Sequence, residues 1–209
     1  MRVAGVDGTK GGWVAVVLDD GGFVDDFLLW PVETDFAELA DAEVVAIDIP
    51  IGFGPREADR AARAFLTGSA SVVFPTPPRD VLEAPFGPGL RVSAQAHALG
   101  PRILHVTDLA RRDPRFREVH PEVSFRAMNR GQPLGHRKKS AAGALKRLEL
   151  LQQAAIDLTE IQGSGSAPLD DVLDAAAAAW SAHRIATGAA QGLPDPPQTI
   201  DGYPVAIWY

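Results

Sequence analysis

The sequence predicts an α/β domain with a mixed sheet, in which an antiparallel meander of three strands is joined by parallel strands and covered by helices on both faces. Three apolar runs, at residues 2–7, 13–19 and 23–30, follow one another with glycine-rich turns between them, which is typical of a meander. A fourth run, Val44–Asp48, is apolar until its last residue and indicates a central parallel strand. Apolar residues at helical spacing dominate the last third of the chain.

The first run ends in an acid and then in turn residues, namely Asp7, Gly8, Thr9 and Lys10. The end of such a strand presents a carboxylate and free backbone N–H groups to a ligand. Glycine has no side chain, so the backbone can pass close to that ligand. Asp-Gly is equally a strong hairpin signal, and the next run is another strand. This stretch alone is consistent with either a turn or a site.

The fourth run repeats the pattern of the first, because Asp48 ends it and a proline follows shortly after. Before it, residues 33–42 carry an apolar stripe and predict a short helix that returns the chain to the sheet. Ligands of open α/β sheets bind beyond the carboxyl ends of the parallel strands, so Asp7 and Asp48 are expected to converge. Two buried carboxylates repel each other, and a divalent cation between them would remove that penalty.

The middle of the chain combines periodic segments with a proline-rich stretch. Residues 55–66 predict a helix, and residues 68–100 predict a loop insertion within one domain that spans residues 1–209. Arg79 in this loop could reach a phosphate, although a plain structural loop is the simpler interpretation. Residues 101–109 form either a helix or an irregular crossing.

A short strand predicted at residues 117–120 precedes Glu122, a third acid at a possible strand tip. His120 and Glu122 belong either to a functional site or to a local hydrogen-bonded corner, and the sequence does not separate the two. Residues 140–157 then predict a helix, and residues 163–167 predict a short flexible break.

A helix predicted from Pro168 to Ser181 carries three acids followed by five alanines. Asp170 lies in its first turn, where the helix dipole satisfies a carboxylate. Asp171 and Asp174 are three residues apart and project from nearly the same face, which the alanines predict to pack closely on the sheet. An acid pair on a buried face needs a compensating cation. The chain closes at residues 204–209 with an edge strand or an apolar tail.

Composition narrows the kinds of site and partner. There is no cysteine, and the five histidines lie too far apart for a local zinc motif, so zinc is not expected. The net charge of −7 argues against nucleic acid, but residues 102–147 hold twelve Lys or Arg against four acids. That segment is +8 and the remainder −15, a distribution that predicts a surface for polyphosphate or nucleic acid. Within it, residues 136–140 by themselves favour a solvated helix face.

No apolar run is long enough to span a bilayer, and no basic-then-apolar signal opens the sequence. A cytoplasmic protein without a membrane partner is therefore expected. The length and the 46% hydrophobic content suit a single domain with a proper core.

Together, these segments carry a resemblance to a known superfamily. An Asp-ended first strand, a meander, an Asp-ended fourth strand and a late helix with acids at i and i+3 resemble the ribonuclease H-like superfamily, and the late acid pair is similar to that of Holliday-junction resolvases. Along nearly its whole length the chain resembles an uncharacterised prokaryotic family of predicted ribonuclease H-like nucleases. The segments that carry this resemblance are GVDGTKGGWV, AIDIPIGF, SVVFPTPPR, EVHPEVSF, the RKK segment, DDVLDAAAAAW and the terminal AIWY.

The resemblance implies a nuclease that hydrolyses phosphodiester bonds with two divalent ions, Mg²⁺ or Mn²⁺. Asp7 would bridge the two ions, while Asp48 and the pair Asp171 and Asp174 would supply the outer ligands. Glu122 is implied as a further ligand or a water-orienting group, so Asp48 and Glu122 compete for one role. The candidate substrate-binding residues are Thr9, Lys10, Arg79, Lys138 and Lys139.

Two other functions remain open from the sequence. The segment Asp7–Lys10 also resembles the phosphate loop of actin-like ATPases and sugar kinases, although those proteins clamp the nucleotide between two such domains. ATP-dependent consumption of a small substrate would favour this alternative. The third possibility is a non-catalytic binding module on the same fold, because suitably placed acids establish capacity and not turnover.

Overall fold

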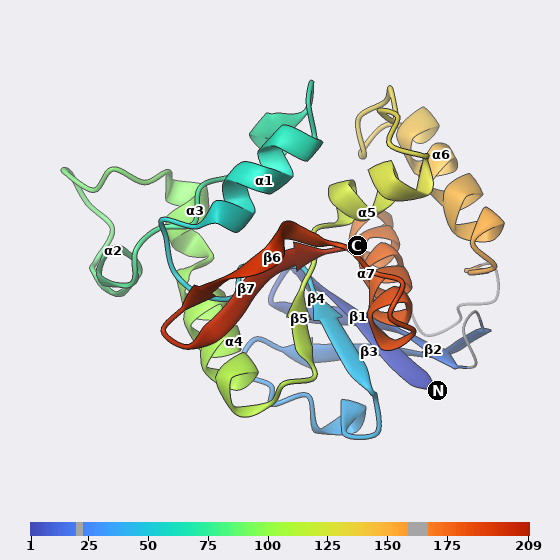
Figure 1. Ribbon diagram of the computed structural model, residues 1–209, viewed down its shortest axis with the longest axis horizontal. Coiled ribbons are helices and arrows are strands. Elements are labelled where there is room, and N and C mark those ends of the chain that lie inside the picture. The colour runs from blue at the N-terminus through green and yellow to red at the C-terminus, as the bar shows by residue number, and fades with distance from the viewer. Residues whose placement is uncertain (20–22, 159–166) are drawn as a thin grey trace.

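The computed structural model describes residues 1–19, 23–158 and 167–209 of the chain. Its strands are β1 (Arg2–Thr9), β2 (Gly12–Asp19), β3 (Phe23–Pro31), β4 (Val44–Ile47), β5 (Phe116–Glu118), β6 (Gly192–Ile200) and β7 (Tyr203–Trp208). They form a five-stranded sheet in the order β3-β2-β1-β4-β5 and a separate pair, β6 and β7 (Figure 1). The loop predicted at residues 20–22 and residues 163–166 of the predicted break lie outside the described residues.

The five-stranded sheet is mixed, as the sequence predicts. β1 pairs antiparallel with β2, which pairs antiparallel with β3, whereas β4 runs parallel to both β1 and β5. The ladder between β1 and β4 continues one step beyond β4, because the Asp48 N–H donates to the Val6 carbonyl at 2.8 Å. The first and fourth strands therefore end at the same edge of the sheet, with Asp7 and Asp48 beside each other.

Helices surround the sheet on both faces. They are α1 (Glu57–Phe65), α2 (Arg79–Glu83), α3 (Ala94–Ala98), α4 (Gly100–Arg112), α5 (Pro121–Met128), α6 (Ala141–Gln153) and α7 (Leu169–Ala186), with short 3₁₀ turns η1 (Ala37–Leu39) and η2 (Ala70–Val72). α4 contributes Ile103 and Val106 to the core on one face, while the alanines of α7 pack into the core on the other. Figure 1 shows α4 and α7 on opposite sides of the strands.

Several predicted elements differ in extent from the observed ones. Residues 33–42 form only the turn η1, because Phe36 adopts a left-handed backbone with φ 56° and cannot continue a helix. Its ring is instead buried against Trp13 and Phe116, each 5.8 Å away between ring centroids. The predicted loop insertion at residues 68–100 contains η2, α2 and α3, and α4 begins where a helix or an irregular crossing was expected.

Helix α7 lies directly on β1. A Cβ atom at Gly5 would come within 1.9 Å of the Ala179 backbone nitrogen, so the strand and the helix approach without a side chain between them. The alanines of α7 are fully buried at this contact, as the sequence predicts. Pro168 precedes α7 as its N-cap and does not occupy its first helical position, but Asp170 and Asp171 still lie in the first turn. Asp174, one turn further on, is thereby carried over the end of β1.

The hairpin of β6 and β7 packs on α1. Ala58 and Ala62 of α1 share a core cluster with Val205 and Ile207 of β7, and an isolated parallel bridge joins Val119 to Trp208. Residues 204–209 were expected to form an edge strand or an apolar tail, and they lie in the strand β7. Its partner β6 was not predicted, because the three prolines of β6 are typical of loops. No described helix has the length and apolarity that crossing a bilayer requires.

Candidate metal centre

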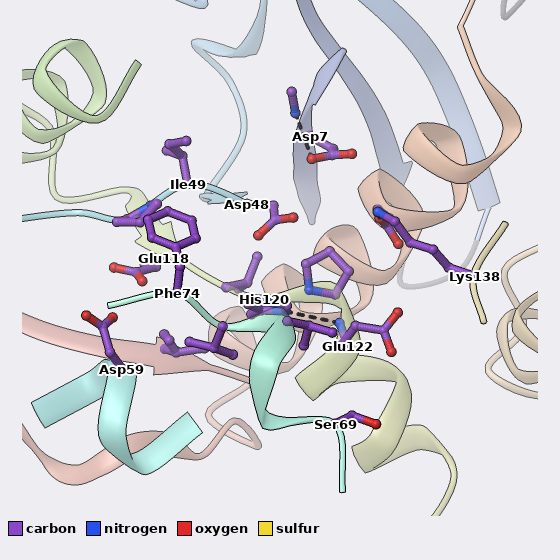
Figure 2. Close-up of a pocket in the computed structure, with 18 of the residues that line it drawn as sticks. Asp7, Asp48, Ile49, Asp59, Ser69, Phe74, Glu118, His120, Glu122 and Lys138 are labelled. Atoms are coloured by element: carbon purple, nitrogen blue, oxygen red, sulfur yellow. Dashed lines mark hydrogen bonds and ion pairs between the residues drawn. The ribbon is translucent and has the colours of Figure 1, made fainter. Parts of the chain in front are cut away.

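Three of the predicted acids meet at the carboxyl edge of the sheet. Asp7 comes from β1, Asp48 follows β4, and Asp174 comes from α7; one carboxylate oxygen of each lies within 4.8 Å of the others. The side chains come from three segments that are distant in the sequence, and the parallel pairing of β1 and β4 aligns the first two. Figure 2 shows Asp7 and Asp48 directed into one cavity, with Lys138 reaching in from another segment.

The cavity in front of these acids has a volume of about 700 Å³. Asp7 and Asp174 are recessed, with exposed fractions of 7% and 3%. The chain around them contributes both signs of charge, since Arg102, Lys138 and Arg147 also line this cavity. Pockets of this size accommodate small organic ligands or one unit of a larger polymer.

Burial and mutual repulsion make the charged forms of the three carboxylates unfavourable. Burial, and then the charges of Asp48, Asp174 and Asp171, hold the pKa of Asp7 well above its usual range, against the opposing effect of Lys138. Burial likewise raises the pKa of Asp48 to about 7 and that of Asp174 to about 7, although Lys138 lowers both. Such groups take up protons or bind a cation at neutral pH.

Asp174 has the most informative contacts. Its Oδ2 atom accepts a hydrogen bond from the Lys138 ammonium group at 2.7 Å. Its Oδ1 atom is buried and has no hydrogen-bond partner among the described residues. A buried carboxylate oxygen without a protein donor is costly unless water or a cation satisfies it, so this atom is available to a ligand.

The residues present fit a divalent metal ion. Three carboxylates supply the hard oxygen ligands that Mg²⁺ and Mn²⁺ prefer, and the unpartnered Asp174 Oδ1 belongs to this group. Asp7 Oδ1 already accepts the Gly8 N–H at 2.7 Å, a contact that fixes the carboxylate without neutralising it. Asp7, Asp48 and Asp174 are therefore the residues that would hold the ion.

Glu122 lies at the cavity but belongs to another interaction. Its carboxylate accepts a hydrogen bond from Arg147 Nη2 at 2.5 Å, and the Arg147 side chain is almost fully buried. The local hydrogen-bonded corner, one of the two alternatives left open by the sequence, is present as well, because His120 Nδ1 accepts the Glu122 N–H at 3.3 Å and caps α5. Burial lowers the pKa of His120. Glu122 is thus held by a cation of the protein and lies outside the three-acid group.

The remaining predicted acids lie outside the centre. Asp171 does not join the group of oxygens within 4.8 Å, although its charge contributes to the raised pKa of Asp7. Asp170 pairs with Lys139 at 3.6 Å, and the Lys139 side chain is 80% exposed. Spacing of i and i+3 places Asp171 and Asp174 on one face, but only the second lies deep enough to reach the end of β1.

The candidate substrate-binding residues are scattered. Lys138 lies in the centre, whereas Lys10 is exposed in the turn after β1 and Thr9 uses its carbonyl to accept from Arg102 at 2.8 Å. Arg79 is exposed and pairs with Glu83 at 2.7 Å. Thr9, Lys10 and Arg79 are absent from the described residues that line the cavity.

Basic residues of the segment 102–147 occupy different environments. Arg102 and Arg147 line the cavity, while Arg111 pairs with Asp201 and Arg115 pairs with its neighbour Asp113. Arg102 was counted only as part of the basic segment, yet its guanidinium lies beside Gly8, next to Asp7. No pattern in the sequence distinguishes it from the other arginines of that segment.

A buried ion cluster lies on another wall of the same cavity. Arg56 donates to Asp59 and to Glu118, and its Nη1 also donates to the Ile51 carbonyl at 3.1 Å. The Arg56 and Glu118 side chains are only 1% and 5% exposed. This cluster fixes the loop after β4 and therefore the position of Asp48 at its start. No local sequence pattern reveals this cluster, because its members are up to 62 residues apart.

The chain was compared with known protein families, curated proteins and solved structures. The family model described as "Protein of unknown function (DUF429)" matches residues 5–199. No curated protein and no solved structure matches the chain.

Proposed function

The chain belongs to the DUF429 family of proteins of unknown function, and we propose from its acid centre that it is a divalent-metal-dependent phosphodiester hydrolase, that is, a nuclease. The observation that carries this proposal is the group of Asp7, Asp48 and Asp174 with the unpartnered Oδ1 of Asp174. We further propose that the sheet is of the ribonuclease H-like kind. The strand order and the acids at the ends of β1 and β4 support that assignment.

The three acids would divide the work of holding the ion and the water. Bound Mg²⁺ or Mn²⁺ would lower the pKa of a water molecule and offset charge on the phosphoryl oxygens. Asp7 is fixed by the Gly8 N–H, and Asp48 follows directly from the β-ladder, so both carboxylates are preorganised by backbone contacts. Asp174 is placed by close packing of α7 on β1.

Positive side chains would position the phosphate. Lys138 and Arg102 line the cavity that holds the acids, so a phosphate ester entering it would meet cations as well as carboxylates. In hydrolysis an oxygen–phosphorus bond forms from water and the ester oxygen–phosphorus bond breaks. The water loses a proton and the leaving oxygen gains one.

A hydrolysis screen tests the proposal. Single-stranded and double-stranded DNA, RNA, branched junctions and nucleotides would be incubated with Mn²⁺ or Mg²⁺ and, separately, with a chelator. We expect metal-dependent cleavage that Asp7→Asn and Asp174→Asn each reduce by a factor of about 100 or more. Asp170→Asn is the matched control and should retain activity, because Asp170 pairs with Lys139 outside the centre.

Three outcomes would count against the proposal. Cleavage that survives in Asp7→Asn would come from another source. Metal binding without cleavage of any phosphodiester would favour the non-catalytic binding module. Metal-dependent conversion of ATP to ADP with a small acceptor would favour the kinase-like alternative, which no contact of Thr9 or Lys10 supports at present.

A further inference from the structure

We infer that the centre binds one divalent ion and that the Lys138 ammonium group takes the place of a second one. The inference rests on the proposed function and concerns how that function is carried out. It departs from the two-ion site that the resemblance implies. Three observations lead to it: the position of Lys138, the charge of the centre and the engagement of the other acids.

Lys138 lies inside the centre and not at its rim. Its Nζ atom is 2.7 Å from Asp174 Oδ2, and the Asp174 side chain is only 4% exposed. The residue belongs to the segment between α5 and α6, and its side chain extends toward the acids of the centre (Figure 2). Asp7, Asp48 and Asp174 all interact with its charge. The ammonium group therefore occupies a position where a metal ion would otherwise contact Asp174.

The charge of the centre matches one divalent ion. Asp7, Asp48 and Asp174 contribute three negative charges when ionised, and Lys138 contributes one positive charge, which leaves −2. One divalent ion cancels this charge. A second would leave +2 around two side chains that are more than nine-tenths buried, and an uncompensated charge in such a place is costly.

The nearby acids that could bind a second ion either form ion pairs with basic side chains or lie outside the group of three oxygens. Glu122 is paired with the buried Arg147, and Asp170 is paired with Lys139. Asp171 lies outside the oxygen group. What remains for a metal is the group of three oxygens, with Asp174 Oδ1 as its unpartnered member. In the described part of the chain this is the single cluster of acids or histidines that fits a metal ion.

An ammonium group can perform part of the role of a second ion. It carries a full positive charge and three rotatable donors, so it can offset charge on a phosphoryl or leaving oxygen beside the ion. It cannot, however, be removed by a chelator. The number of ions bound should therefore be one, and removal of Lys138 should open the second position.

Counting bound Mn²⁺ tests the inference without measuring activity. The free aqueous ion gives a strong electron paramagnetic resonance signal that bound ions lose, so a titration gives the number bound per chain. We expect one for the wild type, two for Lys138→Met and one for Lys138→Arg, which keeps the charge. Lys139→Met is the matched control and should bind one, because its side chain is exposed and pairs with Asp170. If Lys138→Met fails to fold, Lys138→Gln replaces it.

The outcomes separate this inference from the proposed function. Two ions in the wild type, or one ion in every Lys138 variant that lacks the charge, would overturn the inference and leave the metal-dependent hydrolase intact. No bound Mn²⁺ in the wild type would overturn both. One ion in the wild type together with two in Lys138→Met, and no change in Lys139→Met, supports the substitution of an ammonium group for an ion.

Discussion

Replacing Asp7 by Asn should stabilise the metal-free protein and abolish its stabilisation by Mn²⁺. In the folded protein without metal, Asp7 either carries a charge beside Asp48 and Asp174 or takes up a proton, and both cost free energy relative to the unfolded chain. Asparagine avoids both costs. Its side-chain oxygen can still accept the Gly8 N–H, so the local backbone contact is kept.

The size of the effect follows from the geometry. Two unit charges at the 4.8 Å limit of the oxygen group repel by about 3.5 kcal/mol at an effective dielectric constant of about 20. Lys138 offsets part of this repulsion. We therefore expect Asp7→Asn to raise the free energy of unfolding by about 1–3 kcal/mol, or the Tm by roughly 2–12 °C for a protein of this size.

The pH dependence has a definite sign. The pKa of Asp7 is raised in the folded state, so the stability linked to it is present at low pH and is lost as pH rises through the folded-state pKa. The variant lacks this group, so its advantage over the wild type should widen as pH rises above about 4, the ordinary pKa of an aspartate, and level off once the folded-state pKa of Asp7 is passed. Thermal melts followed by circular dichroism in the presence of a chelator measure it.

The same melts with Mn²⁺ complete the test. At a free concentration of about 100 times Kd, the ion should stabilise the wild type by about 2.7 kcal/mol and Asp7→Asn by almost nothing. Asp170→Asn is the control, and its Mn²⁺ response should equal that of the wild type. A lower Tm for metal-free Asp7→Asn, or an undiminished Mn²⁺ shift in that variant, would refute the reasoning and identify Asp7 as a turn residue.

Three further predictions concern pH and packing. The Mn²⁺-induced Tm shift should grow between about pH 6 and about pH 8. Burial raises the pKa values of Asp48 and Asp174 to about 7, so at lower pH protons compete with the ion for these carboxylates. A shift that does not depend on pH would contradict this expectation. Gly5→Ala should lower the free energy of unfolding, measured by urea titration, by about 3 kcal/mol or more, because its Cβ would overlap the backbone of α7. Gly87→Ala is the control: a Cβ atom at Gly87 would meet open space, so the free energy of unfolding should change by less than about 0.5 kcal/mol. Arg56→Met should cost about 3–5 kcal/mol by leaving two buried carboxylates uncompensated, whereas the exposed Arg60→Met should cost under about 1 kcal/mol.

Local patterns predicted the sheet well. The apolar runs and the turn glycines between them predict the same strands of the meander and the same parallel fourth strand. Tertiary packing does not change these strands in the folded protein. Where packing did override the pattern, the prediction was wrong. Residues 33–42 have a helical stripe, yet Phe36 adopts a left-handed backbone and its ring is buried beside Trp13, so the helix does not form there. Strand β6 was not predicted from the sequence, because its prolines are typical of a loop.

The centre was predictable only in part. The convergence of Asp7 and Asp48 follows from the rule that parallel strands share an edge. The alanines predicted that Asp171 and Asp174 would both lie on the buried face, but only Asp174 joins the centre. The spacing of residues along the sequence does not predict which side chains pair with the other acids. Glu122 meets Arg147 across 25 residues, and Lys138 meets Asp174 across 36. Such pairs depend on how loops and helices dock, which a single sequence does not specify.

The backbone contact between β1 and α7 also bears on when the centre can exist during synthesis. Asp7 and Asp48 leave the ribosome before Asp174 and the helix that covers Val3 and Val16. A chain that stops before α7 would expose that face of the sheet and would lack Asp174, one of the three acids of the centre. If the centre binds a metal as proposed, all three ligands come together only after α7 has docked on β1, and the bound ion would link segments from opposite ends of the fold.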